Sequence, residues 1–423
     1  MKIAVLVDLK LSNHSGGHVK YWERLSEALK NLNHDLKLTI FFLGEEKKVI
    51  KINRYVDYFI NKPLISSKVL KKIGIDADDT DLFPLNPFLL YNLKKFDLIH
   101  TTDQFFSMAS TARLASKFWS IPLTTSIHTD TPPYTKYYID KLFDNFFSRF
   151  NFLNLLNKKN KISNFFEKRM YKKIYRYIES VDHAMVADQI YSPESLFKKT
   201  GNQNITKLHR GIDKKVFNFN YTAKKRFLKK YKIEKDEKII FFSGRIHELK
   251  GAMHLAKVHN RLINQGVKVT TLLAGERIHA KECQEIAPSK FHILGYLQKN
   301  EIADLYRTCD LFVFPSQFEI GPNVVIEAKA CGAVCVVSPN GGGKRIYNPG
   351  KDGIIVENMS TKLWAEVINK LLSDPAEIKR IKSFLKSQKI KSWKEIYYDD
   401  LMPYWKKIVS LKNEKNTVIN SSS

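Results

Sequence analysis

The sequence predicts an α/β protein with two parallel sheets in two domains. Short apolar runs alternate with amphipathic segments along a chain of 423 residues. Such runs, when helices separate them, are typical of parallel strands that are covered on both faces. They number about a dozen, which is too many for one open sheet. The length also suits two or three domains.

Each predicted strand is a short apolar run bounded by polar residues. In the first half of the chain these runs are Ile3–Val7, Leu36–Leu43, Asp97–Thr101, Pro122–Ile127 and His183–Val186. In the second half they are Lys238–Phe242, Val267–Leu273, Phe291–Leu294, Leu311–Phe314, Ala333–Val337 and Gly353–Val356. Helical spacing of Leu25, Ala28 and Leu29 predicts a helix over Tyr21–Leu29.

A polar, basic stretch at Asp213–Tyr231 precedes a fresh strand, so we place the domain boundary there. The first domain is predicted to span residues 1–213 and the second 214–390. Residues 391–412 are predicted as a helix that packs back on the first domain. The polar tail 413–423 is predicted to be flexible.

The charge balance favours an anionic partner. Lys and Arg number 70 against 43 Asp and Glu, which gives a net charge of +27. A surplus of this size suits nucleic acid, a membrane surface or a phosphorylated substrate. With 43% hydrophobic and 27% charged residues, the chain is not mainly disordered.

Compartment signals point to the cytoplasm. The four cysteines lack zinc-like spacing and are too few for a disulfide scaffold, which favours a reducing environment. The first apolar run stops at Asp8, too soon for a signal peptide. No run of about 18 apolar residues is present, so we expect any membrane role to be peripheral.

A glycine and two basic residues follow the predicted strand Lys238–Phe242. Open α/β sheets bind ligands at the carboxyl ends of their strands, and Gly244 lets the backbone approach closely. Arg245 and Lys250 can both reach one anion. A diphosphate suits a guanidinium fork beside an ammonium. The alternative is that both cations only form a solvated surface.

Two carboxylates, Glu319 and Glu327, follow the strand Leu311–Phe314. Pro322 is a natural first residue of a helix, and the helix N-terminus supplies N–H groups and positive dipole for an anion. Glu319 then lies on the loop before this helix, and Glu327 lies about one and a half turns inside it. One carboxylate can accept hydrogen bonds from sugar hydroxyls and the other from a ribose diol. The alternative is that both only complement the helix dipole.

The first domain carries weaker signals. Gly16 and Gly17 lie between the first strand and a helix, where they can cradle a phosphate or form a plain turn. His128 stands where the strand Pro122–Ile127 ends, with Tyr134 shortly after it. Asp103 lies at the same kind of strand end. The position favours a functional role for His128, although a lone histidine is usually structural.

Residues 136–176 hold eleven Lys or Arg, three acidic residues and eleven Phe or Tyr. A basic amphipathic stretch with aromatics suits a membrane interface. The residues expected at this interface are Tyr134, Phe143, Phe147, Lys168, Arg169, Lys172 and Lys173. The alternative is that the aromatics belong to the core and the lysines form a solvated face. The net charge favours the membrane.

Together these motifs resemble the retaining family-4 glycosyltransferases with the GT-B fold. The resemblance covers most of the chain and is best over Lys238–Gly343. Segments that carry it are Arg210-Gly211-Ile212-Asp213, Ser243-Gly244-Arg245, Lys250-Gly251, Ala274-Gly275-Glu276, the Glu319/Glu327 pair and Asn340–Gly343. It implies two Rossmann-like domains that face each other across a cleft.

The resemblance also implies a role for each matched residue. Arg245 and Lys250 would hold the donor diphosphate, Glu319 would orient the sugar, and Glu327 would bind the ribose. His128 would contact the sugar near the reacting centre. The implied donor-binding residues are Gly16, Gly17, Gly244, Arg245, Lys250, Glu319, Gly321, Asn323 and Glu327. The residues expected to act in catalysis are His128, Glu319, Arg245 and Lys250.

The implied reaction retains the anomeric configuration and uses no metal or cofactor, because Arg and Lys neutralise the charge. The donor is expected to be a UDP-sugar. The segment from His128 to Tyr134 looks like that of members that glycosylate membrane lipids. We therefore expect a lipid acceptor such as diacylglycerol, at the inner face of the cell membrane. Lys344-Arg345 stands where an acidic residue is common, which favours an acidic donor sugar unless both residues face solvent.

Three other interpretations stay open. The acceptor is alternatively a lipopolysaccharide core or another surface glycan. A nucleic-acid-binding protein fits the charge, but no nucleic-acid-binding motif is present and the positive charge is spread along the chain. An inactive GT-B scaffold has no need for Glu319, Glu327, Arg245 and Lys250 together.

Overall fold

The chain forms two compact units. The computed structural model describes residues 1–12, 17–30, 35–69, 79–128, 131–147, 156–187, 192–219, 229–231, 233–317, 319 and 321–421. Unit 1 comprises Met1–His209 and Trp393–Ser423, and unit 2 comprises Arg210–Ser392. The division before Arg210 lies close to the boundary that the sequence suggests after Asp213.

Unit 1 is built on an eight-stranded sheet in the order β3-β4-β2-β1-β5-β6-β7-β8. Its strands are Lys2–Lys10 (β1), Lys37–Leu43 (β2), Lys48–Lys51 (β3), Val56–Asn61 (β4), Leu98–Thr101 (β5), Leu123–Ile127 (β6), His183–Val186 (β7) and Ile205–Lys207 (β8). All neighbours pair in parallel except β3, which is antiparallel to β4. The central strand β1 is buried from Ile3 to Val7, because its run of apolar residues is covered on both faces.

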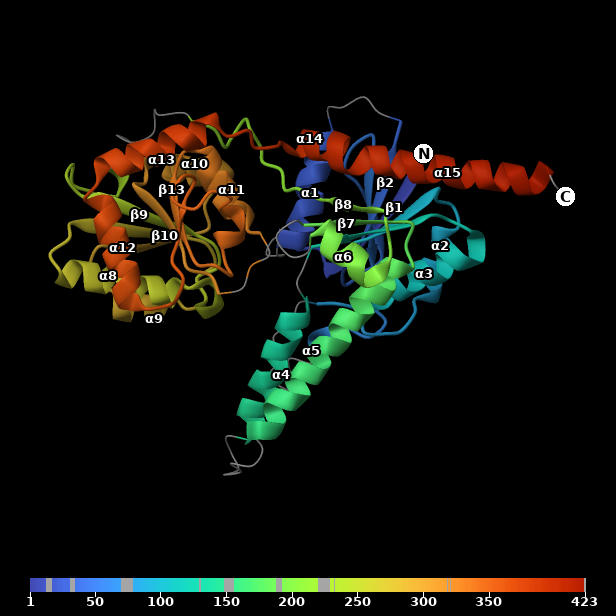
Figure 1. The fold of residues 1–423 in the computed structure, drawn as a ribbon, viewed down its shortest axis with the longest axis horizontal. Helices are drawn as coiled ribbons and strands as arrows, with labels where there is room; N and C mark the ends of the chain where they lie inside the picture. The colour runs from blue at the N-terminus through green and yellow to red at the C-terminus, as the bar shows by residue number, and fades with distance from the viewer. Residues whose placement is uncertain are drawn as a thin grey trace. The chain divides into compact units, whose positions relative to one another are not determined.

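Helices cover both faces of this sheet (Figure 1). They are Gly17–Leu29 (α1), Pro87–Leu93 (α2), Ser107–Trp119 (α3), Thr131–Phe147 (α4), Leu156–Glu179 (α5) and Pro193–Thr200 (α6). One core packs α1 against β1, β2 and β4. The other packs α2, α3 and the end of α5 against the opposite face. The helices α4 and α5 lie side by side as a hairpin (Figure 1).

The C-terminal segment returns to unit 1. It consists of Trp393–Ile396 (α14), a π-helical turn at Tyr397–Leu401 and Met402–Ser421 (α15). Trp393, Ile396 and Trp405 are buried in the same core as α1. Residues 413–421, which the sequence suggests are a flexible tail, continue α15 in the structure. No glycine or proline after Pro403 ends the helix.

Unit 2 is built on a six-stranded, fully parallel sheet in the order β11-β10-β9-β12-β13-β14. Its strands are Lys238–Ser243 (β9), Val269–Ala274 (β10), Phe291–Gly295 (β11), Leu311–Phe314 (β12), Val334–Val337 (β13) and Ile354–Ile355 (β14). Its α-helices are Ala252–Asn264 (α8), Ala280–Ile286 (α9), Lys299–Thr308 (α10), Asn323–Ala330 (α11), Thr361–Leu372 (α12) and Pro375–Ser387 (α13). Short 3-10 turns lie at Glu248–Lys250 (η4) and Gly343–Arg345 (η5). In Figure 1, α8 and α9 lie on one side of the sheet and α10 and α13 on the other.

The predicted pair of parallel sheets is confirmed, with strands at every predicted apolar run. Three strands were missed. β3 is an exposed edge strand with lysine at both ends, and β8 is only three residues long. β4 alternates buried and half-buried residues and pairs on both sides, so its burial depends on neighbours that are distant in sequence. One detail differs in α11: Pro322 is its N-cap, and the helix begins at Asn323.

Candidate functional site

The strand order of the unit 2 sheet has a topological switch point between β9 and β12. These adjacent strands are the first and fourth of the sheet, so the chain leaves them in opposite directions along the sheet. Open α/β sheets bind ligands outside the carboxyl ends of the strands at such a switch point. The motif with Lys250 follows β9, and the motif with Glu319 follows β12. The topology therefore brings these two predicted motifs together.

The loop after β9 packs directly on the loop after β12. Gly251 has a φ of +77°, and a Cβ atom at this position would lie 2.1 Å from the carbonyl oxygen of Pro315. The backbone N–H of Gln317 donates to the carbonyl of Leu249 at 3.0 Å. The side chain of His247 caps the intervening turn η4 by accepting from the N–H of Leu249 at 3.1 Å. Only glycine fits at position 251, and this close approach sets where Lys250 lies.

Lys250 and Glu319 form an ion pair. The ammonium contacts the carboxylate oxygen Oε1, and each side chain is 19% exposed. The Glu319 backbone is held in turn by the loop after β13, because its N–H donates to the carbonyl of Asn340 at 2.9 Å. Three strand ends, those of β9, β12 and β13, thus contribute to one group of residues.

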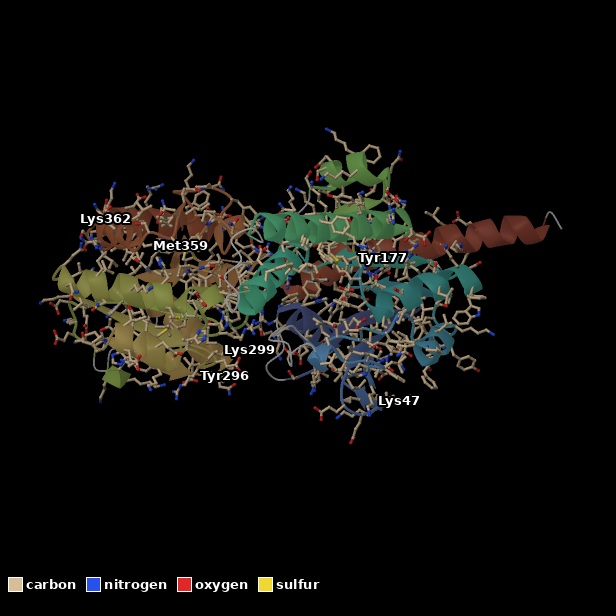
Figure 2. The ribbon with its side chains drawn as sticks, turned by 90° about the horizontal axis from the view of Figure 1, so that it is seen from below. Lys47, Tyr177, Tyr296, Lys299, Met359 and Lys362 are labelled. Carbon is tan, nitrogen blue, oxygen red and sulfur yellow. The ribbon has the colours of Figure 1, made fainter. Side chains whose placement is uncertain are left out.

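Arg245 takes a different position from Lys250. Its side chain is exposed, and its charge acts on Tyr296, which lies on the loop after β11 (Figure 2). Desolvation and the neighbouring Glu276 raise the pKa of the Tyr296 hydroxyl, whereas Arg245 lowers it. Sequence reasoning missed Tyr296. A half-exposed aromatic residue after a strand carries no motif, and only the strand order places it near Glu276 and Arg245.

Gly275 holds the loops after β9 and β10 together. It has a φ of +145°, and a Cβ atom here would lie 1.9 Å from the carbonyl oxygen of Gly244. The N–H of Gly244 donates to the carbonyl of Ala274, and that of Gly275 to the carbonyl of Gly295. Two hydrogen bonds and one close approach therefore hold the backbone of these loops together, which sets where the side chains of Arg245 and Glu276 begin.

The N-terminus of α11 lies beside Glu319. No side chain among the described residues caps it, and Asn323 Oδ1 is buried without a hydrogen-bond partner in the described part of the chain. Helix N-termini with open N–H groups bind anions. Glu327, the other predicted carboxylate, lies within α11 and is only 4% exposed.

Arg345 is buried next to the same loop. It is 2% exposed, so the alternative that the residue only faces solvent fails for Arg345. Lys344 is half-buried. Its guanidinium donates to the carbonyl of Gly321 at 3.3 Å and to the hydroxyl of Tyr347 at 3.4 Å. In the described residues no carboxylate pairs with it, and its Nε has no hydrogen-bond partner. A buried cation without a counter-ion is costly unless a ligand supplies the negative charge.

The glycine-rich element Asn340–Gly343 folds back on β12 and β13. A Cβ atom at Gly341 would lie 2.1 Å from the carbonyl oxygen of Ser316. Behind it, Lys329 and Asp352 form a fully buried ion pair at 2.7 Å. The ammonium also donates to the carbonyl of Arg345 at 2.9 Å. This buried pair fixes the backbone that carries Arg345.

Unit 1 also gathers polar groups at the carboxyl ends of its strands. Asp8 in β1 accepts hydrogen bonds from the N–H groups of Asp81 and Met108. Burial and the nearby charge of Asp103 raise the pKa of Asp8 to about 8. Burial raises the pKa of Asp103 to about 6, although its hydrogen bonds from backbone N–H groups oppose the shift. Asp8 was not predicted as a site residue, since a single acidic residue directly after an apolar run gives no motif.

His128 lies at the end of β6 and is 5% exposed. Its ring stacks on that of His18 at 4.7 Å between centroids. His18 follows Gly17 at the start of α1, so the predicted glycine loop and the predicted histidine meet. Among the described residues, no atom lies within 4 Å of a Cβ built at Gly17. Gly16 lies outside the described residues.

The predicted membrane stretch combines packed and exposed residues. On α5, Tyr177 (Figure 2) is buried together with Ile174 and Ile178. The Tyr177 hydroxyl donates to the hydroxyl of Thr101 in β5. Earlier on the helix Phe165 and Phe166 are exposed by 59% and 41%. The basic residues Lys168, Arg169, Lys172 and Lys173 are exposed as well. Phe143 on α4 is partly buried, and the side chains of Tyr134 and Phe147 lie outside those described.

The described helices include none that combines the length and apolarity needed to cross a membrane. Nor do the described residues include a group of three or more His, Cys, Asp or Glu side chains placed to hold a metal ion.

Comparison with known proteins agrees with the geometry of unit 2. Residues 223–388 match the protein family described as glycosyl transferases group 1. A D-inositol 3-phosphate glycosyltransferase of Paenarthrobacter aurescens is 30% identical over 174 residues, which are 39% of this chain and 42% of the relative. The chain spans about half the length of the curated relatives it matches.

Solved structures resemble the whole chain. The Anabaena protein HepE in complex with UDP-glucose has a TM-score of 0.61 and 16% identity, covering 99% of this chain and 100% of HepE. WaaG, a glycosyltransferase involved in lipopolysaccharide biosynthesis, has a TM-score of 0.59 and 13% identity, covering 97% and 99% of the two chains. These likenesses, with the two parallel sheets, confirm the predicted GT-B fold class.

Proposed function

We propose that this chain is a glycosyltransferase that moves a sugar from a nucleotide-sugar donor to an acceptor. The observation that carries the proposal is the Lys250–Glu319 pair at the switch point of the unit 2 sheet. The family match over residues 223–388 and the UDP-glucose complex of HepE support the same interpretation.

The donor diphosphate would bind between Lys250 and the N-terminus of α11. The ammonium and the uncapped N–H groups both attract a negative charge. Lys250 now contacts Glu319, so a diphosphate competes for it and leaves the Glu319 carboxylate to accept hydrogen bonds from the sugar. In the transition state the leaving nucleotide gains charge, which Lys250 stabilises. Arg245, exposed on the neighbouring loop, reaches the diphosphate from the other side.

The nucleoside would extend from the diphosphate towards β10 and β11. Tyr296 offers an exposed aromatic face there, and Glu276 lies beside it. We place the ribose diol at Glu327, whose carboxylate lies inside α11. UDP is the proposed nucleotide because HepE, with the same fold, is solved with UDP-glucose.

We further propose that the reaction retains the anomeric configuration and needs no metal. Lys250 and Arg245 neutralise charge that a divalent cation otherwise carries. His128 of unit 1 would contact the sugar near the reacting carbon. It stands at the carboxyl end of β6, stacked on His18 next to the glycine loop.

Arg345 extends the proposal to the donor sugar. A buried guanidinium without a carboxylate partner in the described chain lies against Gly321, two residues after Glu319. An acidic sugar such as a uronic acid would supply the missing negative charge. We therefore propose that the enzyme prefers an acidic donor sugar to a neutral one.

The proposed acceptor is a membrane lipid such as diacylglycerol, reached from an anionic membrane surface at the inner face of the cell membrane. Phe165 and Phe166 are exposed on α5 a turn before the basic residues Lys168–Lys173. Exposed aromatics beside lysines suit the interface of an anionic bilayer. The second candidate is a lipopolysaccharide core, favoured by the likeness to WaaG.

The test is sugar transfer from radiolabelled UDP-glucose, UDP-galactose, UDP-glucuronate and GDP-mannose to vesicles that contain diacylglycerol. Glu319→Ala and Lys250→Ala serve as inactive controls. A labelled lipid that both variants fail to make supports donor site and acceptor together. Donor hydrolysis without a lipid product supports the transferase but favours a glycan as the acceptor. No donor binding and no turnover contradict the proposed function.

A further inference from the structure

A chain of buried polar groups connects His128 to the C-terminal helix of unit 1. Ser126 Oγ lies 2.7 Å from His128 Nε2 and 2.9 Å from His100 Nε2. At the far end, the indole Nε1 of Trp405 lies 3.4 Å from His100 Nδ1. Ser126, His100 and Trp405 are completely buried. The groups come from β5, β6 and α15, which are far apart in the sequence.

The direction of these hydrogen bonds follows from Trp405. An indole N–H only donates, so His100 Nδ1 must accept and cannot carry a proton. The hydroxyl of Thr124 also lies 2.9 Å from this nitrogen, but its proton has a second acceptor in the carbonyl of Ile99 at 3.4 Å, so the Trp405 N–H decides that Nδ1 accepts. Burial lowers the pKa of His100 to about 3, so the ring is neutral near neutral pH. A neutral ring with a bare Nδ1 has its proton on Nε2.

The same reasoning passes through Ser126 to His128. His100 Nε2–H donates to Ser126 Oγ, so the serine hydroxyl proton is directed at the other neighbour, His128 Nε2. A neutral His128 then accepts at Nε2 and carries its proton on Nδ1. The ring plane is held as well, because His18 stacks on it and Tyr21 meets it edge-on at 4.7 Å.

We propose that Trp405 sets the tautomer of His128 through His100 and Ser126, so that neutral His128 donates from Nδ1. Trp405, His100 and Ser126 are thus positioning residues. Free histidine in water favours the proton on Nε2, so the buried chain reverses the intrinsic preference. The C-terminal helix α15 is then part of the site, beyond its role in the core. The tautomer does not depend on the proposed function, whereas its effect on turnover rests on that function.

The direct test is nuclear magnetic resonance of the full chain labelled with 15N-histidine, in mildly alkaline buffer. The signal of His128 is assigned by its loss in His128→Asn. In the wild type we expect an unprotonated Nε2 and a protonated Nδ1. Ser126→Ala and Trp405→Phe should both move His128 towards the Nε2–H form, the first more completely. A wild-type His128 that is already protonated on Nε2 overturns the proposal, as does an unchanged signal in Trp405→Phe.

Two matched variants separate this effect from general loss of packing. Ser107→Ala removes another buried hydroxyl of unit 1, one without a hydrogen-bond partner in the described residues. Trp364→Phe removes a buried indole N–H that donates to Asn358 in unit 2. Both should leave the His128 signal unchanged. A shift in either one contradicts a specific connection from Trp405.

Turnover gives the second measurement. With any donor that the wild type uses, Ser126→Ala should lower kcat/KM about tenfold, which corresponds to about 1.4 kcal/mol. Ser107→Ala should stay within about twofold of the wild type. If the wild type transfers no sugar, the proposed function fails while the resonance experiment still decides the tautomer. If Ser126→Ala changes the tautomer without changing kcat/KM, the positioning role is wrong.

Discussion

Lys250 and Glu319 form an ion pair across the switch point of the unit 2 sheet, although 69 residues separate them in the sequence. Each belongs to a loop that follows one of two adjacent strands, and Gly251 allows these loops to touch. The pair is neutral as it stands. A diphosphate that binds Lys250 must take the place of the Glu319 carboxylate, so donor binding and the release of Glu319 are coupled.

This coupling predicts opposite effects of two substitutions on UDP binding. Lys250→Met removes the cation and should weaken UDP binding about tenfold. Glu319→Gln removes the competing carboxylate and should leave UDP binding unchanged or tighter, while it lowers sugar transfer about a hundredfold. Isothermal titration with UDP and a transfer assay measure the two quantities. Equal weakening of UDP binding in both variants would contradict the competition.

A second prediction concerns the close approach of Gly251 to Pro315. Gly251→Ala places a Cβ atom 2.1 Å from a backbone oxygen and should destabilise unit 2 by about 3 kcal/mol or more. Gly266→Ala is the matched control. Gly266 has a φ of +76° against +77° for Gly251, but no atom of the described part of the chain lies within 4 Å of its Cβ position.

For Gly266→Ala we expect only the conformational cost, about 1 kcal/mol. Calorimetry measures the unfolding of unit 2, to which both glycines belong, in each variant. If the two variants lose the same stability, the contact with Pro315 does not fix the loop that carries Lys250.

A third prediction follows from Asp8. Its pKa is about 8 in the folded protein, against the ordinary value of 3.8, mainly because burial disfavours the charged carboxylate. Between about pH 4 and pH 8, Asp8 is therefore protonated in the folded protein but ionised in the unfolded chain. Stability of unit 1 should fall as pH rises through this window, by up to about 1.4 kcal/mol per pH unit.

Asp8→Asn should flatten this slope above about pH 6, since the amide does not ionise. Below that pH, Asp103, whose pKa burial raises to about 6, still contributes. Urea unfolding followed by tryptophan fluorescence measures it, because Trp364 alone among the five tryptophans lies in unit 2. Asp97→Asn, at a carboxylate that accepts from the N–H of Lys2 near the surface, should keep the slope. If the stability of Asp8→Asn still falls steeply between pH 6 and pH 8, another group causes the effect.

The sequence predicted the sheets better than the side-chain contacts. Buried parallel strands such as β9 and β12 are continuous apolar runs, so the pattern reveals them without knowledge of their neighbours. Strand β4 was missed because its burial depends on pairing with β2 and β3. The glycine and carboxylate motifs indicated which loops matter. They did not indicate that Lys250 contacts Glu319 whereas Arg245 lies near Tyr296, because strand order decides this.

Burial explains the other misses. Arg345 was left open between a ligand role and a solvated surface, and only packing beneath Gly321 shows that it is enclosed. Ser126 and His100 lie within predicted strands and Asp8 directly follows one, where single polar residues have no periodic signal. Their partners are contributed by β5, β6, α3 and α15, which a local pattern cannot identify.

A fourth prediction concerns membrane binding by α5. Replacing Phe165 and Phe166 with serine should reduce flotation with vesicles that contain anionic lipid, since both side chains are exposed in the protein. Replacing Lys168, Arg169, Lys172 and Lys173 with glutamine should remove the dependence of binding on anionic lipid and on salt. Tyr175→Phe is the control, because this residue packs against the core. If the serine variant floats as well as the wild type, Phe165 and Phe166 do not bind the membrane and this face of α5 is only solvated.

The fifth prediction separates Arg345 from its neighbour. If the buried guanidinium binds an acidic donor sugar, Arg345→Gln should lower kcat/KM for UDP-glucuronate about a hundredfold, as expected for loss of a charge-assisted contact of about 3 kcal/mol. For UDP-glucose the loss should be much smaller, because a neutral sugar makes no such contact. Lys344→Gln is the matched control, since Lys344 is only partly buried and should leave the ratio of the two donors unchanged.

The ratio of kcat/KM for UDP-glucuronate to kcat/KM for UDP-glucose decides this test, because damage to the fold lowers both values and cancels in the ratio. Arg345 supports Gly321 through a hydrogen bond, so its loss disturbs the Glu319 loop for every donor. An equal loss for both donors therefore means that Arg345 acts through the loop alone. A selective loss for the acidic donor means that the sugar carboxylate reaches the guanidinium, and the loop must open enough to admit it.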